Sequence, residues 1–249
     1  MSLPLAKLRP AKIRSAARRR LFEGVMERAP LQAGPSILLL GRKYGGYAIP
    51  DGVVQPSWIC YCVGAGGDIS FDLELIHRFG ATVRAFDPVP SYVELAQAEA
   101  GDDPRFSVHQ VALASADGPL RMQITHDRAS HSVSAAELYD THEFLELPGR
   151  TLRSLMSELG DERVDLLKMD VEGAEYGLLA DLDLRDVGVK LFAVQLHHTG
   201  TVRQARALIR RLDRQGYVAV GRKPAVKLTF LARDLLAGDS AQPPASSSS

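Results

Sequence analysis

Short apolar runs alternate along the chain with segments whose apolar residues recur every three or four positions. A strand buried on both faces is apolar throughout, whereas a helix needs apolar residues on one side only. The short runs predict strands at 58–63, 81–86, 106–113, 120–125, 164–169, 189–196, 217–220 and 226–232. The intervening spacing predicts helices at 69–79, 92–98, 152–159, 174–182 and 202–212. Residues 126–150 are polar and irregular, which predicts a long loop.

This order of elements predicts one α/β domain over residues 35–235. Strands that alternate with helices form a mostly parallel, doubly wound sheet. The last two strands follow each other closely and are expected to pair as a hairpin through residues 221–224. Residues 1–34 are predicted to form a basic, helical N-terminal extension. Residues 236–249 are rich in Ser, Pro and Ala, which predicts a disordered tail.

Composition and charge narrow the class of protein. The chain of 249 residues is 45% hydrophobic and 24% charged, as is typical of a soluble globular protein. No apolar stretch reaches the roughly 20 residues that span a bilayer, and no signal-peptide core follows the first Met, so we expect a cytoplasmic protein. Basic and acidic residues balance at 30 each, but the first 30 residues hold eight basic and two acidic groups. We interpret this segment as a helix with a solvated basic face, with contact to an anionic surface as the alternative.

Candidate chemistry begins at the glycine-rich loop that follows the first predicted strand. Glycines at this junction permit a tight turn and let a ligand approach free backbone N–H groups. Asp87 ends the second predicted strand, 21 residues beyond Gly66, where an acid accepts hydrogen bonds from ribose hydroxyls. A turn before Pro88 is the alternative account of Asp87. The loop and the acid together predict a nucleoside site that includes Gly64, Ala65, Gly66, Asp68, Asp87 and Pro88.

The residue at position 69 bears on which nucleoside binds. A dinucleotide-binding loop has a third glycine three residues after the second, where it packs helix against strand. Ile69 stands at that position. The sequence therefore disfavours a dinucleotide and favours an unphosphorylated adenosine such as S-adenosylmethionine. Asp68, just before it, is predicted to cap the following helix.

Three segments resemble the FkbM-type S-adenosylmethionine-dependent methyltransferases: CVGAGGDISFDLEL (62–75), AFDPVP (85–90) and VDLLKMDVEGAE (164–175). The resemblance implies a class I methyltransferase fold, which is Rossmann-like with a seven-stranded sheet. It also implies O-methylation of a sugar, glycan or secondary metabolite. Two positions depart from the family pattern, since Gly67 and Gln195 stand where the family often has Glu.

Carried onto this chain, the resemblance places the methionine and ribose portions of the cofactor along the glycine loop and Asp87. The backbone of Val111 and Ala112 would lie near the adenine. Asp170, at the end of a predicted strand, would hold the cofactor's ammonium or help to place the acceptor. Tyr47 belongs to an aromatic-glycine segment that precedes the first strand in the family, and it is a candidate acceptor-binding residue with Glu172 and His198.

Removal of a proton from the acceptor hydroxyl requires a base with a pKa near neutral. His197 is the candidate through the family's histidine position, with Asp170 as the second catalytic candidate. The Gln195 departure leaves open how such a base would be oriented. His126 and His131 lie in the predicted loop, where solvent exposure explains them better than a lid function. No tight metal-ligand spacing is present, so we expect no metal.

Other functions remain open from the sequence. An RNA or protein methyltransferase could use the basic N-terminal helix, but the residues after it are net acidic, so we expect no nucleic-acid partner. A nucleotide-binding oxidoreductase is disfavoured by Ile69, and Gln195 keeps an inactive nucleoside-binding domain open. The sequence indicates neither the identity of the acceptor nor the oligomeric state.

Overall fold

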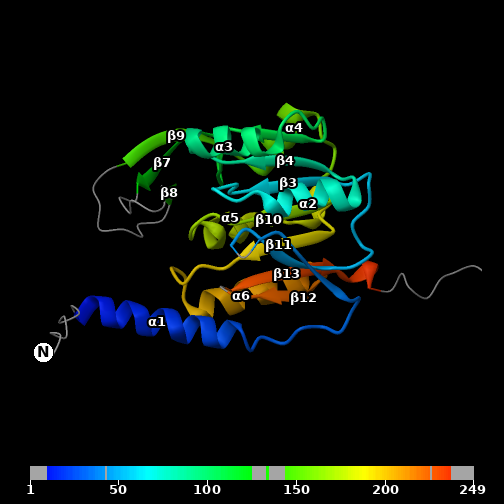
Figure 1. Cartoon of the computed structure of the whole chain (residues 1–249). Coiled ribbons are helices and arrows are strands. Elements are labelled where there is room, and N and C mark those ends of the chain that lie inside the picture. Colours follow the sequence, from blue (N-terminus) through cyan, green and yellow to red (C-terminus); the bar gives the residue numbers. More distant parts are fainter. Residues whose placement is uncertain (1–9, 43, 125–132, 135–143, 225, 237–249) are drawn as a thin grey trace, which may run out of the picture.

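A seven-stranded sheet runs through the middle of the molecule in the order β12-β13-β11-β10-β3-β4-β5 (Figure 1). The computed structural model describes residues 10–42, 44–124, 133–134, 144–224 and 226–236, with backbone alone for 10–15, 123–124 and 133–134. The strands are β3 (Ile59–Val63), β4 (Thr82–Phe86), β5 (Phe106–His109), β10 (Leu166–Met169), β11 (Leu191–Gln195), β12 (Tyr217–Lys223) and β13 (Lys227–Ala232). In this sheet β13 runs antiparallel to β11 and β12, and the other pairs of neighbouring strands are parallel. The expected doubly wound, mostly parallel seven-stranded sheet is confirmed, and so is the C-terminal hairpin. The turn predicted at 221–224 is misplaced, because residues 221–223 belong to β12 and pair with β13.

Helices cover both faces of this sheet because successive strand residues point to opposite sides. The side chains of Cys60 and Cys62 pack with α2 (Ser70–Phe79) and α3 (Pro90–Ala100). Tyr61 and Val63 pack on the other face with α4 (Leu152–Leu159), α5 (Glu175–Asp181) and α6 (Val202–Arg214). Two short 3-10 helices, Arg185–Val187 and Arg233–Leu235, follow α5 and β13. None of the helices in the described residues is long and apolar enough to cross a membrane.

A second, four-stranded sheet corrects part of the prediction. It consists of β6 (Ala112–Leu113), β7 (Gly118–Ile124), β8 (Val133–Ser134) and β9 (Phe144–Arg150). The predicted loop at 126–150 is therefore wrong at 133–134 and from residue 144 onward, where β9 pairs antiparallel with β7. The predicted strand at 106–113 is split, because the chain turns between His109 and Val111 and β6 pairs with β9. His126 and His131 lie outside the described residues.

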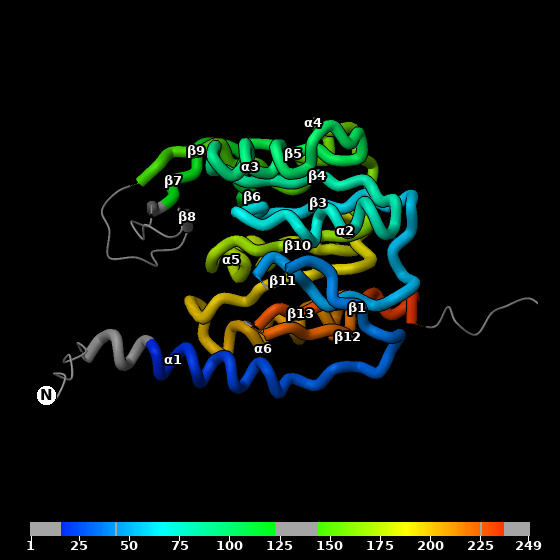
Figure 2. Tube along the Cα trace, in the orientation of Figure 1, coloured from blue at the N-terminus to red at the C-terminus, as the bar shows by residue number. Residues whose placement is uncertain are grey.

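The N-terminal segment adds a helix and a hairpin. The helix α1 (Pro10–Met26) packs Phe22 and Met26, each 1% exposed, into the core on the α6 side of the sheet. The hairpin β1 (Ile37–Leu40) and β2 (Tyr47–Pro50) was not among the predicted strands. Although it precedes β12 and β13 by some 170 residues, it lies beside them (Figure 2) and thereby buries Tyr47 completely. Residues 237–249, most of the predicted tail, lie outside the described residues.

Candidate functional site

A cavity of about 360 Å³ opens at the carboxyl ends of β3, β4 and β10. Strand order reverses between β3 and β10, and in open α/β sheets such a reversal leaves a crevice for ligands. Its volume falls in the range of small-molecule sites. Ten of the residues predicted from the sequence line it: Gly64, Ala65, Gly66, Asp68, Asp87, Pro88, Val111, Ala112, Asp170 and Glu172.

The glycine loop is shaped by close backbone contacts. Gly64 has a φ of 78°, and a Cβ atom there would lie 1.9 Å from the carbonyl oxygen of Asp170. Only glycine can therefore let the ends of β3 and β10 approach so closely. Gly66 also has a positive φ, of 57°, and a Cβ there would meet no protein atom within 4 Å. Since Gly66 lines the cavity, the missing side chain leaves room for a ligand beside the backbone.

Asp87 fastens this loop to the next strand. Its Oδ2 accepts a hydrogen bond of 2.8 Å from the backbone N–H of Gly66, and its Oδ1 accepts one of 2.9 Å from Val89. Asp87 is only 4% exposed, and burial raises its pKa even though the two backbone N–H groups favour the anion. A carboxylate can accept about four hydrogen bonds, so acceptor positions remain for a ligand in the cavity. The turn and the binding interpretations of Asp87 are thus compatible.

Asp68 contributes differently from the prediction. The N-cap position of α2 is occupied by Ile69, and Asp68 lies one residue earlier. Its Oδ1 accepts from the backbone N–H of Ser70 at 3.1 Å, and its Oδ2 accepts from Gly45 at 3.0 Å. The predicted N-cap is therefore wrong by one residue. Asp68 instead ties the segment before β2, which also lines the cavity through Tyr44 and Gly45, to the glycine loop.

The far end of the cavity is apolar. Val111 and Ala112 line it together with Leu113, and β7 adds Leu120 and Met122. These side chains come from the second sheet and the segment leading into it, which were predicted only in part. An apolar wall of this kind suits a planar heterocycle, whose faces gain by leaving water.

The polar end of the cavity is built around Asp170, which follows β10. Lys227 at the start of β13 also lines the cavity, and its Nζ lies 3.6 Å from Asp170 Oδ2. Burial lowers the pKa of Lys227 to about 8, although the charge of Asp170 opposes the change. Tyr47 is not a lining residue, but its hydroxyl lies 3.5 Å from the same Oδ2, and the Lys227 ammonium sits 4.5 Å from its ring centre.

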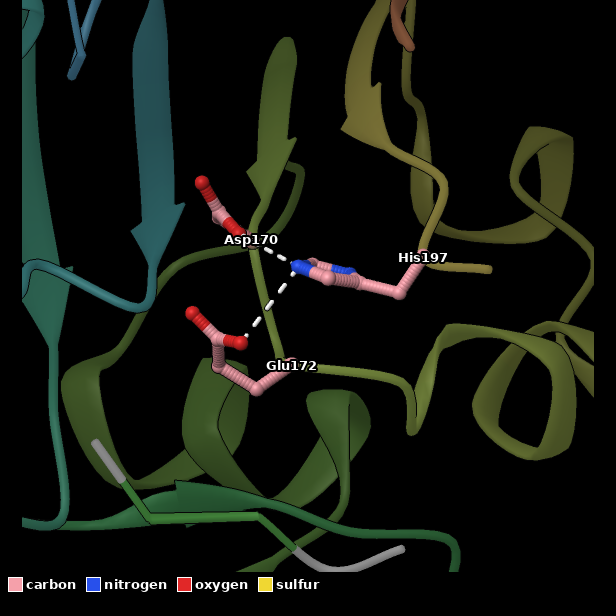
Figure 3. A group of neighbouring side chains, drawn as sticks. All are labelled: Asp170, Glu172 and His197. Atoms are coloured by element: carbon pink, nitrogen blue, oxygen red, sulfur yellow. Dashed lines mark ion pairs between the residues drawn. The ribbon is translucent and has the colours of Figure 1, made fainter. Parts of the chain in front are cut away.

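His197 reaches the other side of Asp170 from the segment after β11 (Figure 3). Its Nε2 lies 3.7 Å from Asp170 Oδ1 and 3.5 Å from Glu172 Oε2. Its Nδ1 lies 3.4 Å from an oxygen of Glu175, which is completely buried. Burial disfavours the charged imidazole, but Glu175 and the two other carboxylates outweigh that effect and raise the pKa of His197.

The structure shows which residue orients His197, although Gln195 stands where the family often has Glu. Glu175 Oε1 accepts the backbone N–H of His197 and also faces its ring, so a buried carboxylate on α5 orients the histidine. The amide of Gln195 lies 3.1 Å from His197 Nε2 and itself lines the cavity. His197 is not among the lining residues, so it contacts the cavity through Asp170, Glu172 and Gln195.

His198 is also absent from the cavity lining. The side chain of Arg18 on α1 donates hydrogen bonds of 2.7 and 2.9 Å to the carbonyl oxygens of His198 and Thr199. Burial, followed by the charges of Arg19 and Arg18, lowers the pKa of His198. Both histidines follow β11, which ends at Gln195, and do not end it as predicted.

Two buried lysines show what sequence reasoning missed. Lys168 lies in the apolar run 164–169, and from that position alone we expect it to pair with a carboxylate. Its Nζ instead donates to the carbonyl oxygen of Gly64 at 2.5 Å and makes no ion pair among the described residues. Lys227 was not singled out, although it too lies in an apolar run, which was the signal used for Lys168. Its partners Tyr44 and Asp170 are distant in sequence, so only the folded chain brings them together.

One group of side chains has the donors that a cation requires. Asp170, Glu172 and His197 each offer one ligand atom, and these atoms all lie within 4.8 Å of one another (Figure 3). Two carboxylates and an imidazole suit a divalent ion. A protonated His197 would satisfy the same two carboxylates, so the geometry accommodates either positive charge.

Comparisons with known proteins find several that are similar to this chain. The methyltransferase FkbM domain matches residues 59–219. The probable methyltransferase-like protein 24 of Rattus norvegicus is 33% identical over 81 residues, a match that covers 27% of this chain and 22% of that protein. The chain thus matches about a fifth of that relative's length. A Methanococcus jannaschii fibrillarin, a pre-rRNA processing protein, has a TM-score of 0.43 and 10% identity over 76% of this chain and 71% of its own.

The FkbM match covers well over half of the chain and includes the glycine loop, Asp87, Asp170 and His197. Together with the order and direction of the seven strands, it shows that the chain belongs to the FkbM family of methyltransferases.

Proposed function

We propose that this protein is an S-adenosylmethionine-dependent methyltransferase that methylates a hydroxyl oxygen of a sugar, glycan or secondary metabolite. The observation that carries the proposal is a single cavity that combines the glycine loop, the buried Asp87 and the polar group around Asp170. The first two suit a nucleoside, and the third suits a reacting hydroxyl. Membership of a methyltransferase family supplies the reaction type.

The residues present fit S-adenosylmethionine better than a dinucleotide. Gly66 leaves open space beside the backbone, and Asp87 keeps acceptor capacity for ribose hydroxyls. The apolar wall formed by Val111, Leu120 and Met122 would take the adenine. Ile69 is fully packed in the core, so the junction has no third glycine where a pyrophosphate-binding loop would have one.

When bound, S-adenosylmethionine supplies an electrophilic methyl group on its sulfonium. Transfer of that group is an in-line displacement, so the protein mainly aligns the donor and the acceptor. Asp170 is placed to accept a hydrogen bond from the acceptor hydroxyl or from an ammonium group. Glu172 and Gln195, which line the same end, would contact the rest of the acceptor.

Proton removal is assigned to the pair Asp170 and His197. Asp170 lines the cavity, whereas His197 Nε2 lies 3.7 Å behind its Oδ1. A hydroxyl proton that reaches this pair can be held on His197, because the surrounding carboxylates stabilise the imidazolium. Lys227, whose Nζ lies 3.6 Å from Asp170 Oδ2, would place a positive charge beside that carboxylate while the histidine changes charge. This scheme requires no metal.

The acceptor class rests on the size and chemistry of the cavity. A volume of about 360 Å³ is that of a small-molecule site, so only a small group, such as one sugar ring or the end of a glycan, would reach a bound cofactor. Its polar end carries carboxylates, which would repel the phosphates of a nucleic acid. Protein substrates and a purely nucleoside-binding function are the alternatives, and the cytoplasmic location stays a prediction.

The proposal is tested with radiolabelled S-adenosylmethionine. The purified protein is incubated with fractionated metabolites and glycans, and labelled products are identified by mass. We expect a product that carries the methyl group on a hydroxyl oxygen. Label on RNA or on protein would contradict the acceptor class. Tight cofactor binding without labelling of any acceptor fraction would support a binding protein instead.

A further inference from the structure

A stripe of arginines runs along the outer surface of α6. Arg203, Arg206, Arg210 and Arg214 follow one another at intervals of three, four and four residues and are all exposed. At 1.5 Å per residue the stripe is about 16 Å long. The residues that α6 buries against the sheet are Ala205, Leu208 and Leu212. At 100° per residue the arginines lie on the opposite side of the helix, so their side chains face solvent.

These four arginines have no partner within the part of the chain that the structure describes. None of them makes an ion pair or a side-chain hydrogen bond there, whereas Arg211 on the same helix donates to the carbonyl oxygen of Leu182. Four like charges on three turns of one helix repel one another. An arrangement that costs stability and serves no internal contact points to an external, negatively charged partner.

The neighbouring helix α1 extends the positive surface. It packs against α6, and Arg18 ties it to the segment that leads into α6 (Figure 1). Together α1 and α6 hold ten of the 30 Lys and Arg residues of the chain but only two of its 30 Asp and Glu residues. The rest of the chain is consequently net acidic. Leu21 on α1 is 65% exposed, an apolar side chain among basic ones.

The chemistry of this surface distinguishes between anionic partners. Single-stranded nucleic acids are bound by basic grooves with aromatic side chains on which bases stack. The sequence of α6, VRQARALIRRLDR, contains no aromatic residue, and the one aromatic residue of α1, Phe22, is buried. A basic helical surface with an exposed leucine is instead suited to anionic lipid headgroups. Such headgroups attract positive charge, and an apolar side chain can insert between them.

We propose that the surface formed by α1 and the arginine stripe of α6 docks this protein on an anionic membrane surface. The phosphates of the lipid headgroups would contact the arginines, and Leu21 would enter the headgroup layer. The cavity lies at the carboxyl edge of the sheet, where α6 begins soon after His197. The docked protein therefore has its cavity close to acceptors that are carried on lipids.

The test compares two double variants of the full chain. Arg206→Gln with Arg210→Gln removes two charges from the stripe, and the matched control Arg78→Gln with Arg153→Gln removes two exposed charges from α2 and α4. Sedimentation measures binding to phosphatidylcholine vesicles with and without about 30% phosphatidylglycerol. The wild type should bind only the anionic vesicles, and less in high salt. The stripe variant should bind roughly 30-fold more weakly, and the control within about twofold of wild type.

Three outcomes would overturn the proposal. Wild-type protein that does not bind anionic vesicles has no membrane-docking surface. Equal weakening in both double variants would reflect net charge and not the stripe. Tighter binding to an RNA of about 20 nucleotides than to anionic vesicles at equal salt would identify the surface as a nucleic-acid site. An unchanged melting temperature verifies that the stripe variant is folded, since the side chains of its two replaced arginines make no hydrogen bond or ion pair with the described residues; the control loses only the exposed ion pair of Arg153 with Asp186.

Discussion

The Asp87 carboxylate combines two functions in one side chain, because it fastens the glycine loop and faces the cavity. We predict that Asp87→Ala weakens binding of S-adenosylhomocysteine by about 1.5–3 kcal/mol, which is roughly ten- to hundredfold. The variant should also unfold at a lower temperature, because it leaves the N–H groups of Gly66 and Val89 without their acceptor. Calorimetric titration measures the affinity.

Asp103→Ala is the matched control, since Asp103 also accepts a backbone hydrogen bond but is only half-buried and does not line the cavity. It should leave the affinity unchanged. If Asp87→Ala binds S-adenosylhomocysteine as tightly as the wild type does, then Asp87 only shapes the turn and does not bind the cofactor.

His197 is the residue whose protonation should limit the rate. We predict that His197→Ala lowers methyl transfer to a hydroxyl by about 10²–10⁴-fold while cofactor affinity stays near wild type. In the wild type the rate should rise with pH, because the imidazole must be neutral to take the proton. Since the carboxylates raise its pKa, this rise should be centred above the usual value of about 6.5.

The pH–rate profile also separates His197 from its neighbours. His198→Ala should keep the profile, because His198 does not line the cavity and faces the basic residues of α1. Lys227→Met should lower the rate but keep the histidine-range rise. If the rise with pH disappears in the Lys227 variant and persists in His197→Ala, then Lys227 is the base. Its pKa of about 8 is near enough to neutral for that role.

At the scale of elements, α1 is a structural part of the domain and not a loose extension. Phe22 and Met26 belong to the same core as α6, and Arg18 bonds to the segment that holds His197 and His198. We predict that Phe22→Ala lowers the free energy of unfolding by about 3–5 kcal/mol. Leu21→Ala, its exposed neighbour, should change it by less than about 0.5 kcal/mol. Chemical denaturation measures both, and equal effects would contradict the packing of α1.

Elements with a strong local pattern could be predicted from the sequence. The buried strand β3, the parallel partners β4 and β10, and helices such as α6 follow directly from apolar runs and helical spacing. The hairpin β1–β2 was not predicted because its strands are short and are buried by β12 and β13, which are distant in sequence. The strand β9 was not predicted because its alternation of apolar and polar residues is weak within a polar segment. Its pairing with β7 is seen only in the folded chain.

The candidate site was predictable where chemistry is local in sequence. The glycine loop and Asp87 are found from their spacing, and Asp170 from its place at a strand end. Lys227 and Glu175 required the fold, because their relevance depends on Asp170 and His197, which approach them only through the sheet. His197 was expected in the crevice, but the structure places it one layer behind the lining residues.

At the scale of the whole molecule, positive charge must balance the carboxylates that converge beside the cavity. We assign that charge to Lys227 and, once His197 has taken up the acceptor proton, to its imidazolium, so we predict that exhaustive treatment with a chelator leaves the methyl-transfer rate unchanged. Melting temperature with and without Mg²⁺ is the companion readout. Loss of activity that Mg²⁺ restores would show that Asp170, Glu172 and His197 hold a cation.

The central claim is that the cavity binds the adenosine of S-adenosylmethionine. Titration calorimetry of the purified protein with S-adenosylhomocysteine and, separately, with NAD tests it most directly. We predict a single site for S-adenosylhomocysteine with affinity at least about tenfold higher than for NAD, because the loop has Ile69 in place of a third glycine. NAD bound more tightly than S-adenosylhomocysteine would contradict the account.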